Sequence, residues 1–133
     1  MPMNKENDSK KRILIVDDTA RSLNDANAAV KAMGYDTVAV SSAEEGLGIL
    51  EKGGIDLVIV DNDMPKTSGL KMVEMMRQNK NHTPVIIVTS LLPELRESTA
   101  KRLKVSDYLN KNLHSERAKR VIAHTLGVHA ESV

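Results

Sequence analysis

The sequence predicts an α/β protein built on a doubly wound, five-stranded parallel sheet. Short runs of Val, Ile and Leu alternate with helical patterns between Arg12 and Leu126, and this alternation is typical of βαβ units. Several of the apolar runs end in a polar residue that suits ligand binding, as strands of such sheets commonly do. The length of 133 residues is sufficient for one domain with a substantial core.

Five apolar runs predict the strands, because each is short, rich in β-branched residues and bounded by polar or turn residues. In chain order they cover residues 12–16, 35–40, 55–61, 84–89 and 105–109. Apolar residues that recur every three or four positions predict the helices between them. In chain order the helices cover about 19–33, 42–52, 70–78, a segment that begins at Pro93, and 115–126.

Local signals fix the ends of these helices. Gly34 ends the first helix, and Gly127 is the C-cap of the last. Ser42 and Glu45 form a capping box at the start of the second helix, and Pro93 fits the first turn of the fourth. We therefore expect a disordered N-terminal segment at residues 1–11, one domain at 12–127 and a short C-terminal tail at 128–133.

The composition narrows the class of protein. There is no cysteine, so disulfides and thiolate metal sites are excluded. The net charge of +1 gives no reason to expect a nucleic-acid partner. No apolar run is long enough to span a bilayer, and residues 1–11 lack the apolar segment of a signal peptide. We expect a cytoplasmic protein without a membrane or nucleic-acid partner.

Polar residues stand at the C-terminal ends of four predicted strands. Asp17 and Asp18 follow the first strand, and Asp61 closes the third. Thr89 closes the fourth strand, and Lys111 comes shortly after the fifth. Because the carboxyl ends of the strands in a doubly wound sheet lie side by side, we expect these side chains to meet in one crevice.

The chemistry of this set favours phosphoryl transfer. Three neighbouring carboxylates raise one another's pKa unless a cation neutralises them, and Mg²⁺ prefers such oxygen ligands. Lys111 adds an ammonium and Thr89 adds a hydroxyl, which can position a phosphoryl group and stabilise its charge. Asp61 can then be the nucleophile that forms an acyl phosphate.

Four pieces of the sequence carry a resemblance to a known family. They are Val16-Asp17-Asp18, Val60-Asp61-Asn62-Asp63-Met64-Pro65 with Ser68-Gly69, Val88-Thr89, and Asp107-Tyr108-Leu109-Asn110-Lys111. In order and spacing they resemble the response-regulator receiver domain of the CheY-like type, over about residues 12–126. The resemblance implies a flavodoxin-like (βα)5 fold with strand order 2-1-3-4-5, in a stand-alone, single-domain form.

The resemblance also implies an acceptor and a metal site. Asp61 is similar to the family's phosphoacceptor, which also binds the metal. Asp18 resembles the direct ligand of the acidic pair, and Asp17 the residue that orients a metal-bound water. The backbone carbonyl of Asp63 is the implied third protein ligand. The expected cofactor is Mg²⁺.

A second group of residues resembles the family's switch. Lys111 is similar to the lysine that pairs with the phosphoryl oxygens, and Thr89 to the hydroxyl that responds to them. Tyr108 resembles the aromatic residue that changes rotamer with that hydroxyl. We also expect Asp63 and Leu91 to border the mouth of the pocket and to set the lifetime of the acyl phosphate.

The sequence departs from the family at two positions. Asn112 stands where the family usually has a proline joined by a cis bond, and Ser90 replaces the usual Ala or Gly. A cis bond before a non-proline residue costs about 3–4 kcal/mol, and nothing in the sequence offsets that cost. We therefore predict a trans bond between Lys111 and Asn112.

The resemblance implies two-component signalling. A sensor histidine kinase or histidine phosphotransfer protein would donate the phosphoryl group, and output would go through protein contact. A surface between the fourth and fifth helices is a candidate for an acidic partner, because it carries Lys101, Arg102, Lys104, Arg117, Lys119 and Arg120. We expect the protein to catalyse only its own phosphorylation and dephosphorylation, and not to be an enzyme otherwise.

Other interpretations remain open. Asp17 and Asp18 also suit an N-cap of the first helix, Tyr108 also suits half-buried packing, and the basic residues also suit a solvated surface. Asp61-Asn62-Asp63 has the D-x-D spacing of haloacid-dehalogenase-type phosphatases, although those enzymes carry the pair after their first strand. A binding module that works without phosphorylation is a further alternative, which Asn112 supports.

Overall fold

The computed structural model describes residues 10–90 and 101–128. Within them lie the strands β1 (Arg12–Val16), β2 (Asp36–Val40), β3 (Leu57–Asp61), β4 (Val85–Val88) and β5 (Asp107–Leu109). The helices are α2 (Ala20–Ala32), α3 (Ala43–Glu51), α4 (Gly69–Gln78) and α6 (Glu116–Leu126). The helix predicted to begin at Pro93, the pocket position predicted for Leu91 and most of the two predicted terminal segments lie outside the described residues.

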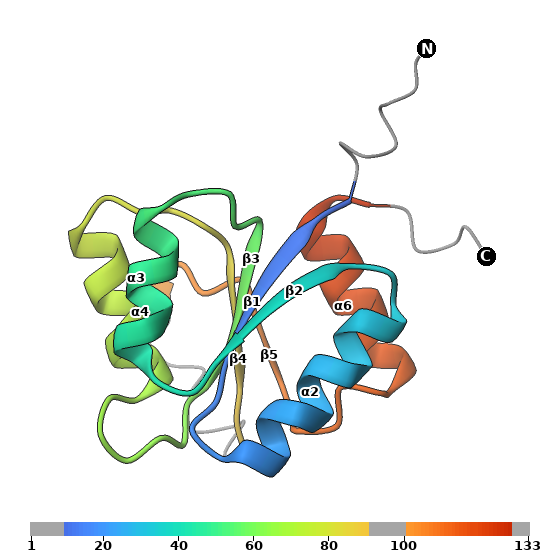
Figure 1. Cartoon of the computed structure of the whole chain (residues 1–133). Coiled ribbons are helices and arrows are strands. Elements are labelled where there is room, and N and C mark those ends of the chain that lie inside the picture. The colour runs from blue at the N-terminus through green and yellow to red at the C-terminus, as the bar shows by residue number, and fades with distance from the viewer. Residues whose placement is uncertain (1–9, 91–100, 129–133) are drawn as a thin grey trace.

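The strands form one parallel sheet in the order β2-β1-β3-β4-β5. Helices α3 and α4 cover one face of the sheet, and α2 and α6 cover the other (Figure 1). This arrangement confirms the predicted fold class and strand order. No helix in the described parts of the chain has the length and apolar character needed to cross a membrane.

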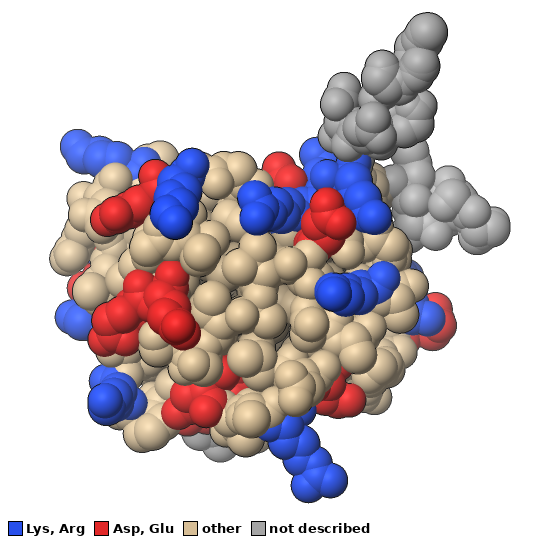
Figure 2. Space-filling model, viewed as in Figure 1, with Lys and Arg blue, Asp and Glu red and all other residues tan. Residues whose placement is uncertain are grey.

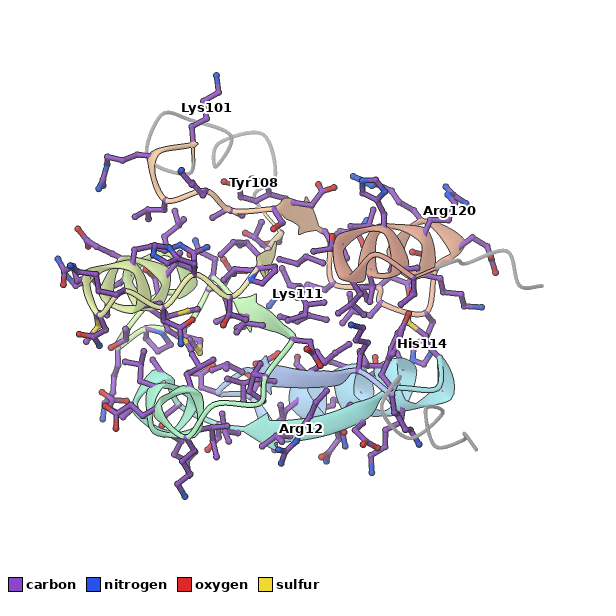
Figure 3. The ribbon with its side chains drawn as sticks, turned by 90° about the horizontal axis from the view of Figure 1, so that it is seen from above. Arg12, Lys101, Tyr108, Lys111, His114 and Arg120 are labelled. Atoms are coloured by element: carbon purple, nitrogen blue, oxygen red, sulfur yellow. The ribbon has the colours of Figure 1, made fainter. Side chains whose placement is uncertain are left out.

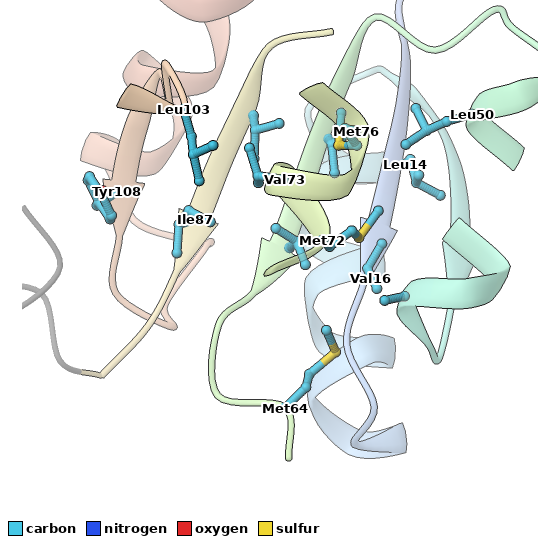
Figure 4. Close-up of a cluster of buried hydrophobic side chains, with 14 residues drawn as sticks. Leu14, Val16, Leu50, Met64, Met72, Val73, Met76, Ile87, Leu103 and Tyr108 are labelled. Atoms are coloured by element: carbon cyan, nitrogen blue, oxygen red, sulfur yellow. The ribbon is translucent and has the colours of Figure 1, made fainter. Parts of the chain in front are cut away.

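The two faces of the sheet have separate cores, because successive side chains of a strand point to opposite faces. Leu14 and Val16 of β1 pack toward α3 and α4, whereas Ile13 and Ile15 pack toward α2 and α6. The chain has no Phe or Trp, and methionine fills much of the first core (Figure 4). The buried methionines there are Met64, Met72 and Met76.

Side-chain caps start three of the helices. Ser42 Oγ accepts a hydrogen bond of 3.1 Å from the Glu45 N–H, as predicted. The return bond of the capping box is displaced by one residue, because Glu45 Oε1 accepts from the Ser41 N–H at 3.0 Å. Ser68 and Ser115 cap α4 and α6 in the same way as Ser42.

The register of the sheet brings the predicted site residues to one edge. Val16 pairs with Val60, and Asp61 pairs with Val88. Val88 in turn pairs with Leu109. The residues that follow β1, β3, β4 and β5 therefore emerge at nearly the same level, at the end of the sheet where the chain enters α2 and α4 (Figure 1).

Candidate functional site

Three carboxylates meet at this edge. One oxygen each from Asp17, Asp18 and Asp61 lies within 4.8 Å of the others. Asp17 is 7% exposed and Asp61 is 4% exposed, whereas Asp18 is open to solvent. The structure thus brings together the three aspartates that the sequence placed after β1 and at the end of β3.

Tight local turns aim two of these carboxylates. Asp17 Oδ1 accepts a hydrogen bond of 3.0 Å from the Thr19 N–H, and Asp61 Oδ1 accepts one of 2.9 Å from the Asp63 N–H. Both are Asx-type turns, which hold an aspartate side chain over the backbone that follows it. The N-cap of α2 is Thr19, without a side-chain hydrogen bond, so neither Asp17 nor Asp18 is the N-cap.

Burial and neighbouring negative charge raise the pKa of Asp17 from 3.8 to about 6. Burial is the largest cause, and the charge of Asp61 and a hydrogen bond shared with it add to the increase. The Thr19 N–H and the Lys111 charge oppose it. The three carboxylates are hard oxygen donors with too little positive charge nearby, so they fit a divalent cation such as Mg²⁺.

Lys111 supplies the positive charge next to Asp61. Its Nζ lies 3.2 Å from Asp61 Oδ1 and 3.5 Å from Asp63 Oδ2. Burial lowers the pKa of Lys111, but its hydrogen bond to Asp61 and the charges of Asp61, Asp63 and Asp17 outweigh burial and raise that pKa. In Figure 3 Lys111 lies in the middle of the molecule, between the two helix layers.

Thr89 and Ser90 both bond to the carboxylate of Asp63, which also lies near Lys111. Thr89 is fully buried, and its Oγ1 donates to Asp63 Oδ1 at 3.2 Å. Ser90 donates to Asp63 Oδ2 from both its hydroxyl, at 3.3 Å, and its backbone N–H, at 3.4 Å. The sequence indicated Thr89 and the Asp63 backbone as site groups, but not the Asp63 side chain as the acceptor that joins these donors.

The loop after β3 is fixed against the start of α4. Asn62 Oδ1 accepts a hydrogen bond of 2.8 Å from the Leu70 N–H. A Cβ atom on Gly69 would lie 3.1 Å from the Asp61 carbonyl oxygen and from Asn62 Cα, which is tighter than ordinary packing allows. Glycine at the first position of α4 therefore permits the close approach that holds Asp61 and Asp63 in place. The sequence did not indicate this role of Asn62, because its side-chain oxygen bonds to a backbone N–H eight residues away in α4.

A cavity of about 570 Å³ opens beside the carboxylates. Asp17, Asp61 and Lys111 line it, and Asp25 and Ala26 of α2 form part of its wall. Apolar side chains complete the wall, among them Ile15, Ile59, Val88 and Leu113. Asp61 therefore borders an accessible space even though its side chain is almost fully buried.

Tyr108 lies one strand away from Thr89. Its side chain is 8% exposed. Tyr108 is therefore more deeply buried than the half-buried packing position that was the alternative to a switch role. It pairs in register with Ile87 and joins the same core as Leu103, at one side of the cluster in Figure 4. The Thr89 N–H donates to the carbonyl of Leu109 at 3.0 Å, so a backbone hydrogen bond ties Thr89 to the residue that follows Tyr108.

The loop after Lys111 runs through consecutive Asx turns. The described residues contain no cis peptide bond, which confirms the predicted trans bond at Asn112. The Asn112 N–H donates to Asn110 Oδ1 at 3.0 Å, and Asn112 Oδ1 accepts from the His114 N–H at 3.1 Å. Asparagine thus uses both an N–H that proline lacks and a side-chain oxygen.

Residues 13–123 match the family described as the response regulator receiver domain. The chain belongs to this family. It is therefore a receiver domain of two-component systems. Receiver domains are phosphorylated by kinases or phosphotransfer proteins and relay signals. The match gives no support to the phosphatase alternative.

Similar proteins include one regulator that is longer than this chain and one of similar length. The receiver domain is 30% identical over 101 residues to the alkaline phosphatase synthesis transcriptional regulatory protein PhoP of Bacillus subtilis, covering 76% of this chain and 42% of PhoP. It is 26% identical over 119 residues to the polar-differentiation response regulator DivK of Brucella ovis, covering 88% of this chain and 97% of DivK. The chain thus spans less than half the length of PhoP and nearly all of DivK.

One solved structure resembles most of this chain. It is the response regulator protein TrrA from Thermotoga maritima in complex with Mg²⁺-BeF. The TM-score is 0.77 and the sequence identity 26%, over 86% of this chain and 98% of the other.

Proposed function

We propose that this receiver domain accepts a phosphoryl group on Asp61 in a Mg²⁺-dependent reaction. The donor is the phosphohistidine of a sensor histidine kinase or of a histidine phosphotransfer protein. The observation that carries the proposal is the position of Asp61: its carboxylate lines an open cavity, lies 3.2 Å from the Lys111 ammonium and shares its edge of the sheet with two further carboxylates.

The transfer is a displacement at phosphorus. An oxygen of Asp61 forms the new bond, the bond between phosphorus and the imidazole nitrogen breaks, and that nitrogen keeps the electron pair. Lys111 neutralises charge on the transferred oxygens, which is the main requirement of phosphoryl transfer. Asp18, Asp61 and the backbone carbonyl of Asp63 would hold Mg²⁺, with Asp17 beside them, and the bound ion would add to that neutralisation.

The proposed output is a change of surface that another protein reads. Thr89 would bond to the phosphoryl group, and Tyr108 would respond through the adjacent strand. Lys101 and Arg120 both extend from the upper side of the molecule in Figure 3, at its left and right ends. Between them in sequence, Arg117 and Lys119 lie 3.9 and 3.2 Å from Asp107 and Glu116. An acidic partner would therefore bind to cations that are partly paired already. On the face in Figure 2, acidic and basic side chains are interspersed.

Two further expectations belong to this proposal. The protein would catalyse only its own phosphorylation and dephosphorylation, because the site holds one nucleophile and the groups that serve it. The cytoplasmic location expected from the sequence stays a prediction.

The proposal is tested by incubation with a small acyl-phosphate donor, with and without Mg²⁺, followed by intact mass. A gain of one phosphoryl group that requires Mg²⁺ is the expected result. If the mass never changes, the chain is a binding module that works without phosphorylation. Steady turnover of a small phosphate ester would instead favour a hydrolase.

A further inference from the structure

The Asp63 side chain already holds the groups that the proposed function assigns to the phosphoryl group. Its Oδ1 accepts from Thr89 Oγ1 at 3.2 Å. Its Oδ2 lies 3.5 Å from Lys111 Nζ and accepts from the Ser90 hydroxyl at 3.3 Å and the Ser90 N–H at 3.4 Å. The two oxygens thus contact an ammonium, two hydroxyls and a backbone N–H.

This carboxylate lies next to the proposed acceptor. The Asp63 N–H donates to Asp61 Oδ1 at 2.9 Å, and the same Oδ1 lies 3.2 Å from Lys111 Nζ. One ammonium is therefore shared by the carboxylate that would be phosphorylated and by the carboxylate two residues later. An anion attached to Asp61 would meet Lys111 and Thr89 in the region that the Asp63 side chain occupies.

We propose that the Asp63 carboxylate is an internal competitor of phosphorylation, which occupies Lys111, Thr89 and Ser90 until a phosphoryl group on Asp61 displaces it. This inference rests on the proposed function. The backbone carbonyl of Asp63, the group assigned to the metal, is separate from the side chain and takes no part in the competition.

The competition follows from the number of donors. Thr89 has a single hydroxyl proton, so it donates either to Asp63 Oδ1 or to a phosphoryl oxygen. Lys111 has three protons and can serve two anions, but a phosphoryl group on Asp61 would bring further negative charge beside Asp63. The Asp63 side chain is 29% exposed, so it can turn toward solvent when it is displaced.

The test measures the affinity of the protein for Mg²⁺ with beryllofluoride, by calorimetry, in the parent, Asp63→Asn and Asp63→Ala. Release of the competing contacts should tighten binding by about three- to tenfold in Asp63→Ala. Asp63→Asn should gain less, because its amide oxygen can still accept from Thr89. Asp56→Asn, at the opposite end of the sheet, removes one charge without touching the site and should bind like the parent.

A second comparison separates competition from a general effect of charge. In a Thr89→Val background the hydroxyl is absent, so Asp63→Ala should gain less than it does in the parent, as expected for coupled residues. Equal gains in both backgrounds would show that Asp63 acts through its charge alone and would overturn the proposed exchange at Thr89. Thermal unfolding of each variant checks that it is folded.

The remaining outcomes distinguish the two proposals. If all variants bind beryllofluoride as the parent does, or more weakly, Asp63 only ties the loop and the competitor proposal is wrong while the proposed function stands. If no protein of the series binds beryllofluoride with Mg²⁺, the phosphoryl site itself is wrong, and the competitor proposal fails with it.

Discussion

Arg77 Nε donates a hydrogen bond of 2.8 Å to the carbonyl oxygen of Leu103 and so ties α4 to the turn before β5. The same guanidinium bonds to three more backbone carbonyls, those of Asn81, Thr83 and Lys104, at 3.0, 2.9 and 3.3 Å. Burial lowers the pKa of Arg77. One side chain therefore satisfies carbonyls from two loops at the end of the sheet opposite the site.

Arg77→Lys should lower the free energy of unfolding by about 2–3 kcal/mol, because an ammonium cannot match the planar fork of a guanidinium and leaves carbonyls unpaired. Urea denaturation measures the change. Arg102→Lys, on an exposed residue of the same region, is the control and should be close to neutral. Equal stability of the two variants would contradict the structural role of Arg77.

Asp17→Asn should stabilise the metal-free protein at about pH 7 by about 1–2 kcal/mol, after allowance for solvent screening of a partly accessible group. The pKa of Asp17 is about 6 in the fold against an ordinary 3.8, so the folded state binds this proton more tightly. The free energy of unfolding of the parent therefore falls as the pH rises from 3.8 to about 6. Asparagine does not ionise, so Asp17→Asn avoids this loss of stability.

The same experiment has a pH control and a metal control. The advantage of Asp17→Asn should disappear near pH 4, below which Asp17 is protonated in both states. Added Mg²⁺ should raise the melting temperature of the parent more than that of the variant. A variant that is less stable than the metal-free parent at neutral pH would show that the carboxylate cluster is not strained.

Thr89→Ala should keep phosphorylation but lose the change that phosphorylation causes around Tyr108, because the hydroxyl is the group of Thr89 that would bond to the phosphoryl oxygen, while its backbone N–H holds β5 at Leu109. The chain has only two tyrosines and no tryptophan. Tyr35→Phe therefore leaves Tyr108 as the single tyrosine for NMR. Thr89→Ser keeps the hydroxyl and should behave like the parent. Identical ring shifts in the alanine variant and the parent would exclude the proposed link.

Asn112→Pro should lower the free energy of unfolding by about 1–2 kcal/mol, because proline removes the N–H that bonds to Asn110 and the oxygen that accepts from His114. Asn112→Asp keeps both groups and is the matched control. Chemical denaturation compares the two. A proline variant as stable as the parent would mean that the Asx turns contribute nothing to the fold.

The fold and the proposed acceptor could be predicted because both follow from the strands. Once the apolar runs are parallel and end at one level, Asp17, Asp61 and Thr89 must meet at the same edge. The strand starts were less accurate. β5 begins at Asp107 rather than at Val105, because Val105 packs against the core as a β-branched residue without joining the ladder.

The side-chain contacts that tune the site could not be predicted in the same way. Thr89 meets the Asp63 carboxylate across 26 residues of sequence, and that contact depends on a rotamer rather than on a repeating pattern. The acceptors of Arg77 are backbone carbonyls, which every residue has, so no residue type indicates them. Such contacts appear only when two loops are placed side by side.

Mapping of the phosphorylated residue tests the central claim most directly. The parent, Asp61→Asn and Asp56→Asn are incubated with Mg²⁺ and a small acyl-phosphate donor, and their intact masses are compared. Asp56 closes the opposite end of the sheet, where it accepts a hydrogen bond from the Arg12 N–H, so its variant is a matched control. We predict one added phosphoryl group on the parent and on Asp56→Asn, and none on Asp61→Asn; unchanged labelling of Asp61→Asn would contradict the assignment of the acceptor.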